Sequence, residues 1–599
     1  YNLLDNSLPG LGLTDGLPYD NEGNPQYTHM TIGSDDLCSA TAGFFGRINY
    51  DYKGIYLFEA NGRYDGSSRF PAADQWAFFP SFSAGYRFSE EGYFKSLKSW
   101  WSNGKLRASW GQVGNEAIGT DMFLSVFGKP ANLNWLNGSG SGLIKGQGLP
   151  SLVSSTLTWE RIQTTDIGID LGFFNNSLNL TFDWYSRQTR DMLAPGADLP
   201  ETLGTRAPYQ NSGRLLTRGW ELGINWNHSF GDAQVYASFS IGDAKTKVTK
   251  WQNDNLTLYS YRIGSGSNTN RLYEGQTYGD IWGMEFDRFF EVDDFSGKDE
   301  NGIWQLKNGV PSQEVLQYGK FVYGPGDVKY KDLNGDGVIN CGTPDPGAGK
   351  RAEYLATHPE DARFLKYPNL APDDPKQGWW PVASAHNHGD LKVVGNAMPR
   401  YEYSFRIGGA WKGFDLDLFF QGVGKRKFYM INNFVLMQAQ GNGNPLYKHQ
   451  IEQGYNKYIY DPETLKITGY DIDQNNLYPV IYPGNFGYNT NFRQTLDQGI
   501  NNWTTTDRYL TNMAYLRLKT ATVGYTLPYE ITKHALIQRA RIYFSCENPF
   551  FIYNGAGKFG MDPELSTSAR GQAAAAGVGA MGRTNPMMRS YSFGLQVTF

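Results

Sequence analysis

The sequence lacks the long apolar runs, the cysteine framework and the charge imbalance that would point directly to a protein class. No run of eighteen apolar residues occurs among the 599 residues, which excludes a membrane-spanning helix. The three cysteines, Cys38, Cys341 and Cys546, are far apart and odd in number, so they form neither a disulfide framework nor a metal-ligand spacing. A formal net charge of -5 gives no support for nucleic-acid binding. Because the chain begins at Tyr1 without a leader, we expect a processed or incomplete chain.

Glycine and aromatic residues are abundant instead, with 71 Gly, 39 Tyr and 36 Phe. The last nine residues, 591–599, place apolar side chains at every odd position and Ser, Gly, Gln and Thr at the even ones. Successive side chains of a strand point to opposite faces, so this segment has one apolar and one polar face. A soluble sheet can produce this pattern, and so can a membrane barrel with lipid on one side and a watery lumen on the other.

Twelve further segments alternate in the same way, which predicts thirteen strands. They lie near 44–52, 56–64, 82–88, 106–111, 167–173, 178–184, 220–226, 235–241, 401–407, 414–420, 514–527, 539–547 and 591–599. We expect residues Glu59, Arg63, Asp170, Asp183 and Arg187 to face the lumen of a barrel, where solvation is the ordinary explanation for each. We expect the last strand to pair with 539–547 on one side. On its other side it would pair with the first barrel strand, which this chain does not contain.

The connections between these segments alternate between short and long. Short turns lie at 53–54, 175–177, 229–233 and 412–413, and long segments lie at 66–79, 114–158, 190–217, 246–400, 424–513 and 548–589. Short turns at one end and long loops at the other are typical of an outer-membrane barrel, whereas a sandwich or propeller gives no reason for them. We therefore predict an all-β, transmembrane antiparallel β-barrel over 44–599, with 1–43 as a leading loop. The segment 246–400 could hold one more strand pair.

Several stretches resemble the SusC-like family of TonB-dependent outer-membrane transporters of Bacteroidetes. They include YLFEANGRYDGSSRFP (56–71), FFPSFSAGYRFSE (78–90), LRASWGQVGN (106–115), LTWERIQTTDIGIDLGFF (157–174), DVKYKDLNGDGVI (327–339), GFDLDLFFQGVG (413–424), YLRLKTATVGYTLP (515–528) and the final strand. The resemblance implies a barrel of 22 strands in the full protein, of which about 13 to 15 would lie in this chain. It also implies a plug domain that this chain lacks.

The same resemblance implies a function and partners. We expect TonB-dependent import of a bulky nutrient across the bacterial outer membrane, with an oligosaccharide as the cargo and an oligopeptide as the alternative. A SusD-like lipoprotein would cap the barrel, TonB-ExbB-ExbD would act through the missing N-terminal region, and SusC-SusD pairs could dimerise. A passive porin or adhesin is a less favoured alternative. No nucleophile elbow or catalytic carboxylate pair stands out, so we do not expect an enzyme.

The segment 332–340 reads DLNGDGVIN, like the start of an EF-hand-type calcium loop. Such a loop takes oxygen ligands from alternate positions, which here are Asp332, Asn334, Asp336, the carbonyl of Val338, and Asn340. The twelfth position is Thr343 where Glu is expected, although Asp345 could substitute after a loop shift. A hard cation such as Ca²⁺ and an Asx-Gly turn that folds on itself are equally open interpretations.

A second candidate site surrounds the pair Trp379 and Trp380. These two side chains could stack on sugar rings or peptide side chains, since they lie in an expected loop and not on an apolar strand face. Nearby, His386, His388 and Asp390 could bind a transition metal. We favour an ordinary polar loop for that triplet, because a zinc site needs a further ligand at useful spacing and none is evident.

Overall fold

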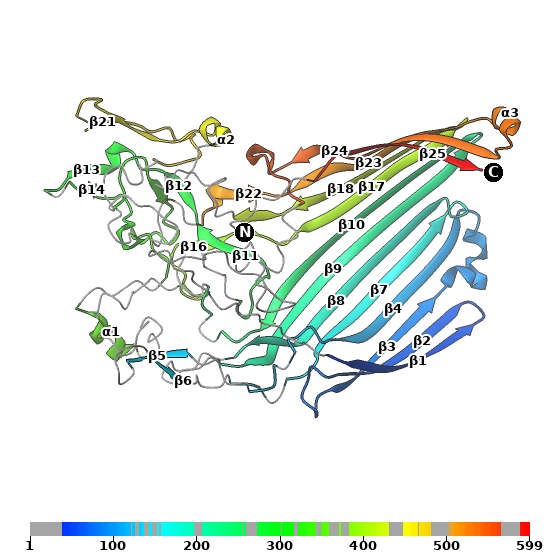
Figure 1. The fold of residues 1–599 in the computed structure, drawn as a ribbon, viewed down its shortest axis with the longest axis horizontal. Helices are drawn as coiled ribbons and strands as arrows, with labels where there is room; N and C mark the ends of the chain where they lie inside the picture. The colour runs from blue at the N-terminus through cyan, green and yellow to red at the C-terminus, as the bar shows by residue number, and fades with distance from the viewer. Residues whose placement is uncertain are drawn as a thin grey trace, which may run out of the picture.

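One antiparallel sheet of thirteen strands forms the wall of the molecule (Figure 1). The computed structural model describes residues 39–599 except 121, 126–130, 137–142, 147–151, 155–156, 197–206, 254–255, 259–271, 301, 317–321, 343–348, 359–370, 373–382, 430–446, 465, 481–501, 503–504 and 565–586. The strands are β1 (Thr41–Tyr52), β2 (Tyr56–Ser67), β3 (Trp76–Tyr86), β4 (Trp101–Asn115), β7 (Glu160–Phe173), β8 (Leu178–Pro195), β9 (Tyr209–Phe230), β10 (Ala233–Lys250), β17 (Arg400–Trp411), β18 (Phe414–Lys425), β23 (Tyr515–Thr526), β24 (Arg539–Asn554) and β25 (Ser590–Thr598).

The thirteen predicted segments are the strands of this sheet, and each pairs with its neighbours in chain order. The last strand pairs with residues 539–547, as the sequence predicted. Several strands are longer than predicted at the end that carries the long connections. The expected loop 190–217 is shorter in the structure, since β8 reaches Pro195 and β9 begins at Tyr209. The described part of 251–399 adds no further strand to the sheet, and it meets the sheet through one isolated bridge between Thr277 and Lys247 of β10.

The two ends of the sheet differ in the length of their connections (Figure 1). At one end β1–β2, β7–β8, β9–β10 and β17–β18 meet in tight hairpins, and β23–β24 are joined through α3 (Tyr529–Thr532). Lys53 and Gly54 both have positive φ in the first hairpin, which fits the twist of the paired strands. The β3–β4 connection, 87–100, lies at the same end, whereas the longest connections, 116–159, 251–399, 426–514 and 555–589, lie at the opposite end.

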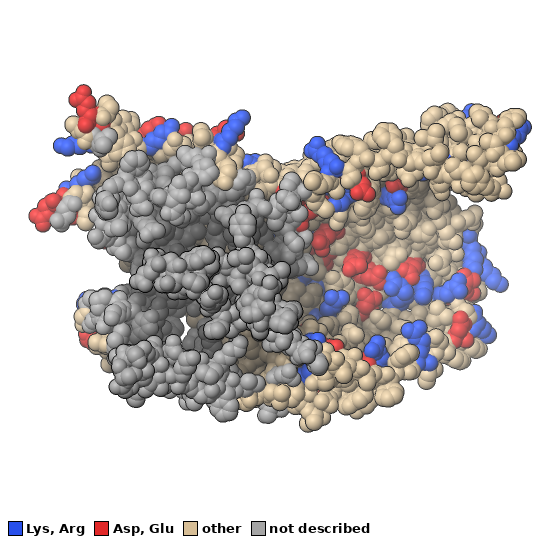
Figure 2. Space-filling view, viewed as in Figure 1, with Lys and Arg blue, Asp and Glu red and all other residues tan. Residues whose placement is uncertain are grey.

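The strand register sorts side chains onto two faces. Ile167 lies opposite Trp184, whereas Gly168 lies opposite Asp183, so apolar and polar rows alternate across the strands. Figure 2 shows acidic and basic side chains gathered along the hollow of the sheet. The other face carries exposed aromatic and aliphatic side chains such as Phe58, Phe82 and Phe593.

Glycine lets bulky tyrosines lie flat across neighbouring strands on the polar face. Tyr185 is the register partner of Gly219, and a Cβ built at Gly219 would come 2.5 Å from the Tyr185 ring. Tyr236 covers Gly408 in the same way two strand pairs further on. A ring can therefore cover the neighbouring backbone only because these positions have no side chain.

Two of the long connections pack into a second body, which we call the outer body and define as the described parts of 251–399 and 426–514. Met284, Phe289, Phe290, Tyr330 and Leu391 are buried at its centre. Its short strands pair as β11 (Asp280–Met284) with β16 (Leu391–Asn396), β12 (Phe286–Phe289) with β15 (Val328–Tyr330), β13 (Phe295–Lys298) with β14 (Trp304–Leu306), β19 (Lys427–Tyr429) with β22 (Leu510–Asn512), and β20 (Lys457–Tyr460) with β21 (Ile467–Asp471).

The remaining elements are short. The outer body includes α1 (Arg351–Thr357) and α2 (Lys448–Glu452), and the β4–β7 connection contains the paired strands β5 (Ala131–Leu136) and β6 (Leu143–Gly146). In the part of the chain that the structure describes, no helix is long and apolar enough to cross a membrane.

Candidate functional site

The hollow face of the sheet carries a chain of ion pairs that joins neighbouring strands. Arg107 of β4 binds Asp170 of β7 through two hydrogen bonds of 2.7 and 2.9 Å, and it also reaches Asp183 of β8 at 2.9 Å. All three side chains are less than a third exposed. A guanidinium that bridges two carboxylates on successive strands fixes the polar wall and leaves it hydrated on the open side.

A second set of ion pairs continues this row across the later strands. Arg406 of β17 donates to Asp417 of β18 at 2.7 Å, and the Tyr236 hydroxyl donates to the same carboxylate. Arg541 of β24 pairs with Asp415 of β18 across the intervening strand. Both carboxylates come from the sequence DLDL, whose alternation sends both Asp side chains to the hollow face.

A recess of about 420 Å³ lies in this wall between the two sets of ion pairs. Three of the carboxylates that line it are Asp183, Glu221 and Glu402, from β8, β9 and β17. Tyr185 adds an aromatic ring and a hydroxyl. The recess therefore offers several hydrogen-bond acceptors and negative charge next to one aromatic surface, on the face that would meet a passing solute.

A third set of charges ties the segment after β24 to the wall. Arg517 of β23 binds Asp562 at 2.9 Å and lies 3.4 Å from Glu564, while Lys519 binds Glu564 at 2.8 Å. Arg517 and Asp562 are each only 5% exposed, and the guanidinium lies 4.2 Å from the centre of the Phe551 ring. Two cations thus neutralise two buried carboxylates at the end of the sheet with the long connections.

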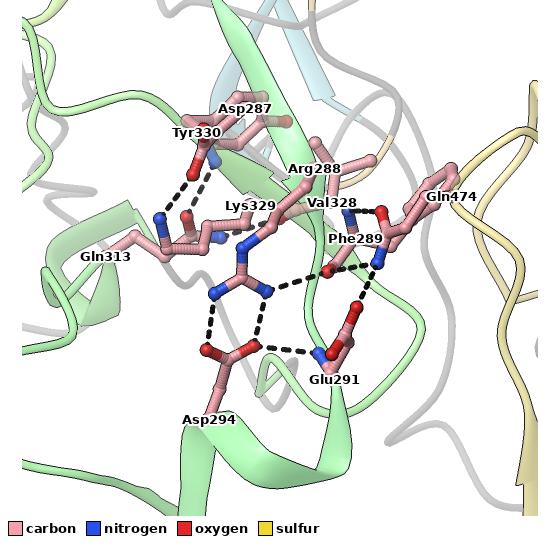
Figure 3. Close-up of polar contacts among 10 residues, drawn as sticks. All are labelled: Asp287, Arg288, Phe289, Glu291, Asp294, Gln313, Val328, Lys329, Tyr330 and Gln474. Carbon is pink, nitrogen blue, oxygen red and sulfur yellow. Dashed lines mark hydrogen bonds and ion pairs between the residues drawn. The ribbon is translucent and has the colours of Figure 1, made fainter.

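Within the outer body, a bidentate ion pair fixes the turn after β12 (Figure 3). Arg288 donates to both oxygens of Asp294 at 2.5 and 2.6 Å, and the backbone N–H of Glu291 donates to the same carboxylate at 2.8 Å. Burial raises the pKa of Asp294, but the bonds from Arg288 and Glu291 outweigh it, so the pKa lies below its ordinary value. The carboxylate is therefore held in its charged form.

The same turn is joined to the other long connection. Gln474 accepts from the backbone N–H of Phe289 at 2.8 Å and donates to Glu291 at 3.0 Å (Figure 3). Arg508 lies 4.0 Å from the centre of the Phe286 ring and donates to backbone carbonyls of Leu477 and Asn476. Burial lowers the pKa of Arg508. The two connections therefore form one packed body.

The predicted calcium loop folds as a network of turns on the surface. Both oxygens of Asp332 accept backbone N–H groups, from Gly335 at 2.7 Å and Gly337 at 2.9 Å. Asn334 accepts from Asp336, and Asp336 accepts from Val338, while the Asn340 amide donates to the Val338 carbonyl at 3.2 Å. Calcium binding here stays a prediction, and Thr343 and Asp345 lie outside the described residues.

Asp390, which the sequence offered as a possible metal ligand, is bound to backbone N–H groups in the structure. It is fully buried, and its two oxygens accept the backbone N–H groups of Leu333 and Asn340, both at 2.7 Å. It therefore braces both ends of the turn network. His388 packs against Trp282 with ring centres 5.2 Å apart. Among the described residues no group of three or more His, Cys, Asp or Glu is arranged for a metal ion.

Trp379 and Trp380 lie outside the described residues, so their predicted ligand contact stays a prediction. The bridging role of Arg107, the pair Arg288–Asp294 and the contacts of Gln474 were missed by the sequence analysis. For Arg107 the alternation of LRASW gave a usable signal, since it predicts a charged side chain on the polar face. For Gln474, 185 residues from its partner Phe289, no local pattern exists.

Comparison with known proteins agrees with this geometry. The family model described as TonB dependent receptor-like, beta-barrel matches residues 2–350. TonB-dependent receptor P3 of Formosa agariphila is 26% identical over 565 residues, which cover 93% of this chain and 45% of that protein. TonB-dependent receptor SusC of Bacteroides thetaiotaomicron is 28% identical over 256 residues, 39% of this chain and 25% of that protein.

Among solved structures, the RagAB peptide importer in its closed-closed state matches with a TM-score of 0.58 at 19% identity, over 94% of this chain and 48% of that chain. This likeness concerns the fold. The chain thus spans about half the length, or less, of the relatives and structures it matches. Because the family model covers more than half of its residues, the chain belongs to the TonB-dependent receptor-like β-barrel family, whose members lie in the outer membrane of Gram-negative bacteria.

Proposed function

We propose that the full-length protein imports a bulky nutrient across the outer membrane, driven by TonB-ExbB-ExbD and capped by a SusD-like lipoprotein. The observation that carries the proposal is the pairing of a charge-lined hollow wall with a packed outer body at one end of it (Figures 1 and 2). A hollow wall that is polar suits the passage of a hydrophilic solute, and a packed outer body offers a surface on which a lid can dock. The similarity to SusC supports the proposed association with a SusD-like lipoprotein.

For the cargo we propose an oligosaccharide. The recess that contains Asp183, Glu221 and Glu402 has carboxylates that can accept hydrogen bonds from neighbouring sugar hydroxyls, and Tyr185 offers a ring for a sugar face. An oligopeptide is the second candidate, because the same carboxylates would attract a basic side chain or an amino terminus. The chemistry of this recess therefore fits both a neutral glycan and a basic peptide.

The cargo can be tested with a strain that lacks only the gene for this protein. The strain would be grown on single glycans and on peptides as the carbon source, and complemented with wild type or with Glu221→Gln. We expect the strain to lose growth on a glycan. Wild type should restore that growth, and only when TonB is present. Restoration without TonB would indicate a passive channel instead, and lost growth on peptides alone would identify the oligopeptide importer.

Binding separates the two cargo classes further. For a neutral glycan, Glu221→Gln keeps an acceptor oxygen, so we expect only a modest loss of affinity. For a basic peptide the same change removes a charge, so the loss would be large and would shrink as salt is added. Calorimetry on the purified complex at two salt concentrations would measure this difference.

A further inference from the structure

The apolar face of the sheet contains a groove. An even covering of large side chains would be expected there. The groove has a volume of about 500 Å³ and runs over β1, β2, β3, β4 and β7. Its floor is formed by Ala60, Ala84 and Ala108, one from each of three neighbouring strands. Ala84 and Ala108 are direct register partners, and both are exposed. Ala60 lies diagonally from Ala84, whose register partner on β2 is Phe58, so the floor crosses the three strands obliquely.

Aromatic side chains form the two sides of this groove. On one side Phe82 and Trp110, which are register partners, stack with ring centres 6.1 Å apart. On the other side Tyr50 and Phe58 are register partners on β1 and β2. Phe58 and Phe82 are each more than half exposed. The aromatic rings extend further from the sheet than the alanine methyl groups between them. They therefore enclose a slot that is apolar on its floor and on both sides.

The depth of the groove in the membrane follows from the aromatic residues at the two ends of β1 and β2. Tyr56 and Tyr86 stack at 5.2 Å beside Tyr52, and Tyr64 stacks with Trp76 at 5.1 Å. Trp76 is aligned through β2 with position 42 of β1, ten residues from Tyr52. Ten residues at about 3.3 Å, tilted by about 40°, span about 25 Å along the membrane normal, the height of a barrel's apolar band.

The groove lies in the half of this band nearest the short turns. Tyr50 and Ile48, which line it, are two and four residues from Tyr52. They therefore lie about 5 to 10 Å inside the band. Short turns face the periplasm in barrels of this type, so the groove opens toward the inner leaflet of the outer membrane. Lys53 follows Tyr52, and its ammonium lies 5.2 Å from the centre of that ring, at the level of lipid headgroups.

We propose that this groove holds one acyl chain of an inner-leaflet phospholipid as a bound structural lipid. Within a bilayer the hydrophobic effect does not drive such binding, because the surrounding lipid is equally apolar. Van der Waals contact favours binding instead, because an unfilled slot has no partner atoms along its floor and both sides. A single flexible chain can enter a slot between rings, and the neighbouring Lys53 can pair with its phosphate.

The test uses the full-length protein purified from outer membranes in a mild detergent, with retained lipid measured by native mass spectrometry. Ala84→Phe and Ala108→Phe fill the groove, and Ala237→Phe makes the same change on the apolar face of β10, away from the groove. We expect wild type and Ala237→Phe to retain a phospholipid and the groove variants to lose it by about ten-fold, equivalent to about 1.4 kcal/mol. Heat-modifiable migration on a gel would report folding of each variant.

Equal retention by all four proteins, or equal loss in Ala237→Phe, would overturn the proposal. Retention of lipopolysaccharide in place of phospholipid would overturn it too, since that lipid belongs to the outer leaflet. If the groove variants instead dissociate an oligomer, a second copy of the protein covers this face. Should both groove variants fail to fold, a phospholipid with a photoreactive acyl chain can be tested on wild type, and it must label peptides of β2 to β4.

Discussion

The most direct test of the charge network concerns Arg517, which holds the segment after β24 against β23. Replacing Arg517 with Met keeps an apolar stem beside Phe551 but removes the cation that faces Asp562. Lys519 still pairs with Glu564, so Asp562 becomes the unpaired charge, at 5% exposure. Removing one partner of a buried ion pair costs about 3–5 kcal/mol. We expect that cost to appear as local opening of 555–564, because the strand register does not depend on this contact.

Hydrogen exchange at the amides of Gly555 and Phe559 would measure this opening. Both amides donate to backbone carbonyls in the wild-type segment, so they report its closed state. A change of about 3–5 kcal/mol corresponds to exchange that is faster by about two to four orders of magnitude. The double variant Arg517→Met with Asp562→Leu should recover most of the protection, since an apolar pair of similar volume replaces a buried ion pair with little loss.

A matched control comes from Lys448 and Glu452, an ion pair of α2 whose side chains are 89% and 61% exposed. Lys448→Met should leave hydrogen exchange in α2 unchanged, because exposed ion pairs contribute little to stability. If Arg517→Met exchanged like wild type, or if the double variant exchanged as fast as the single one, the buried charges would not hold this segment.

Three further predictions concern other parts of the molecule. Gly219→Ala should destabilise the barrel by about 1–3 kcal/mol in urea unfolding, since its Cβ would collide with Tyr185, and adding Tyr185→Ala should relieve part of that loss. The pKa of Asp294 is lowered in the folded state, so its contribution is present above the unfolded pKa of about 3.9 and is lost as pH falls through the folded value. Proteolysis of the outer body should therefore accelerate below about pH 4 in wild type, and Asp294→Asn should remove this acid dependence. If 332–340 binds Ca²⁺, calorimetry should detect binding that Asp336→Asn weakens by about ten-fold, whereas an Asx turn alone would give no heat.

The barrel wall could be predicted from the sequence because one physical rule governs it. Side chains of a strand alternate between two faces, and here the two faces meet lipid and water, so segments such as 178–184 carry the pattern in every residue. The rule weakens beyond the membrane, where both faces are wet. The predictions therefore ended too early at β8, which continues to Pro195, and began too late for β9, which starts at Tyr209.

The outer body could not be predicted in the same way. Its core contains adjacent residues such as Phe289 and Phe290, both fully buried, which fit neither the strand nor the helix period. Its decisive contacts join positions that no local pattern connects. The turn network of 332–340 was visible in its Asp, Asn and Gly residues, but Asp390, which braces both of its ends, follows fifty residues later.

The placement of the segment 251–399 between β10 and β17 has a consequence for how such proteins diversify. These two strands pair directly, from Ala233 with Trp411 to Gly242 with Glu402, although the whole segment 251–399 separates them in the chain. The pairing of β10 with β17 needs no residue of that segment, which behaves as an insertion carried by an ordinary hairpin. Selection can therefore change its length and sequence without disturbing a single register in the membrane. A graft of 251–399 together with 426–514, which Gln474 and Arg508 hold to it, would transfer the outer surface of one receptor onto the wall of another.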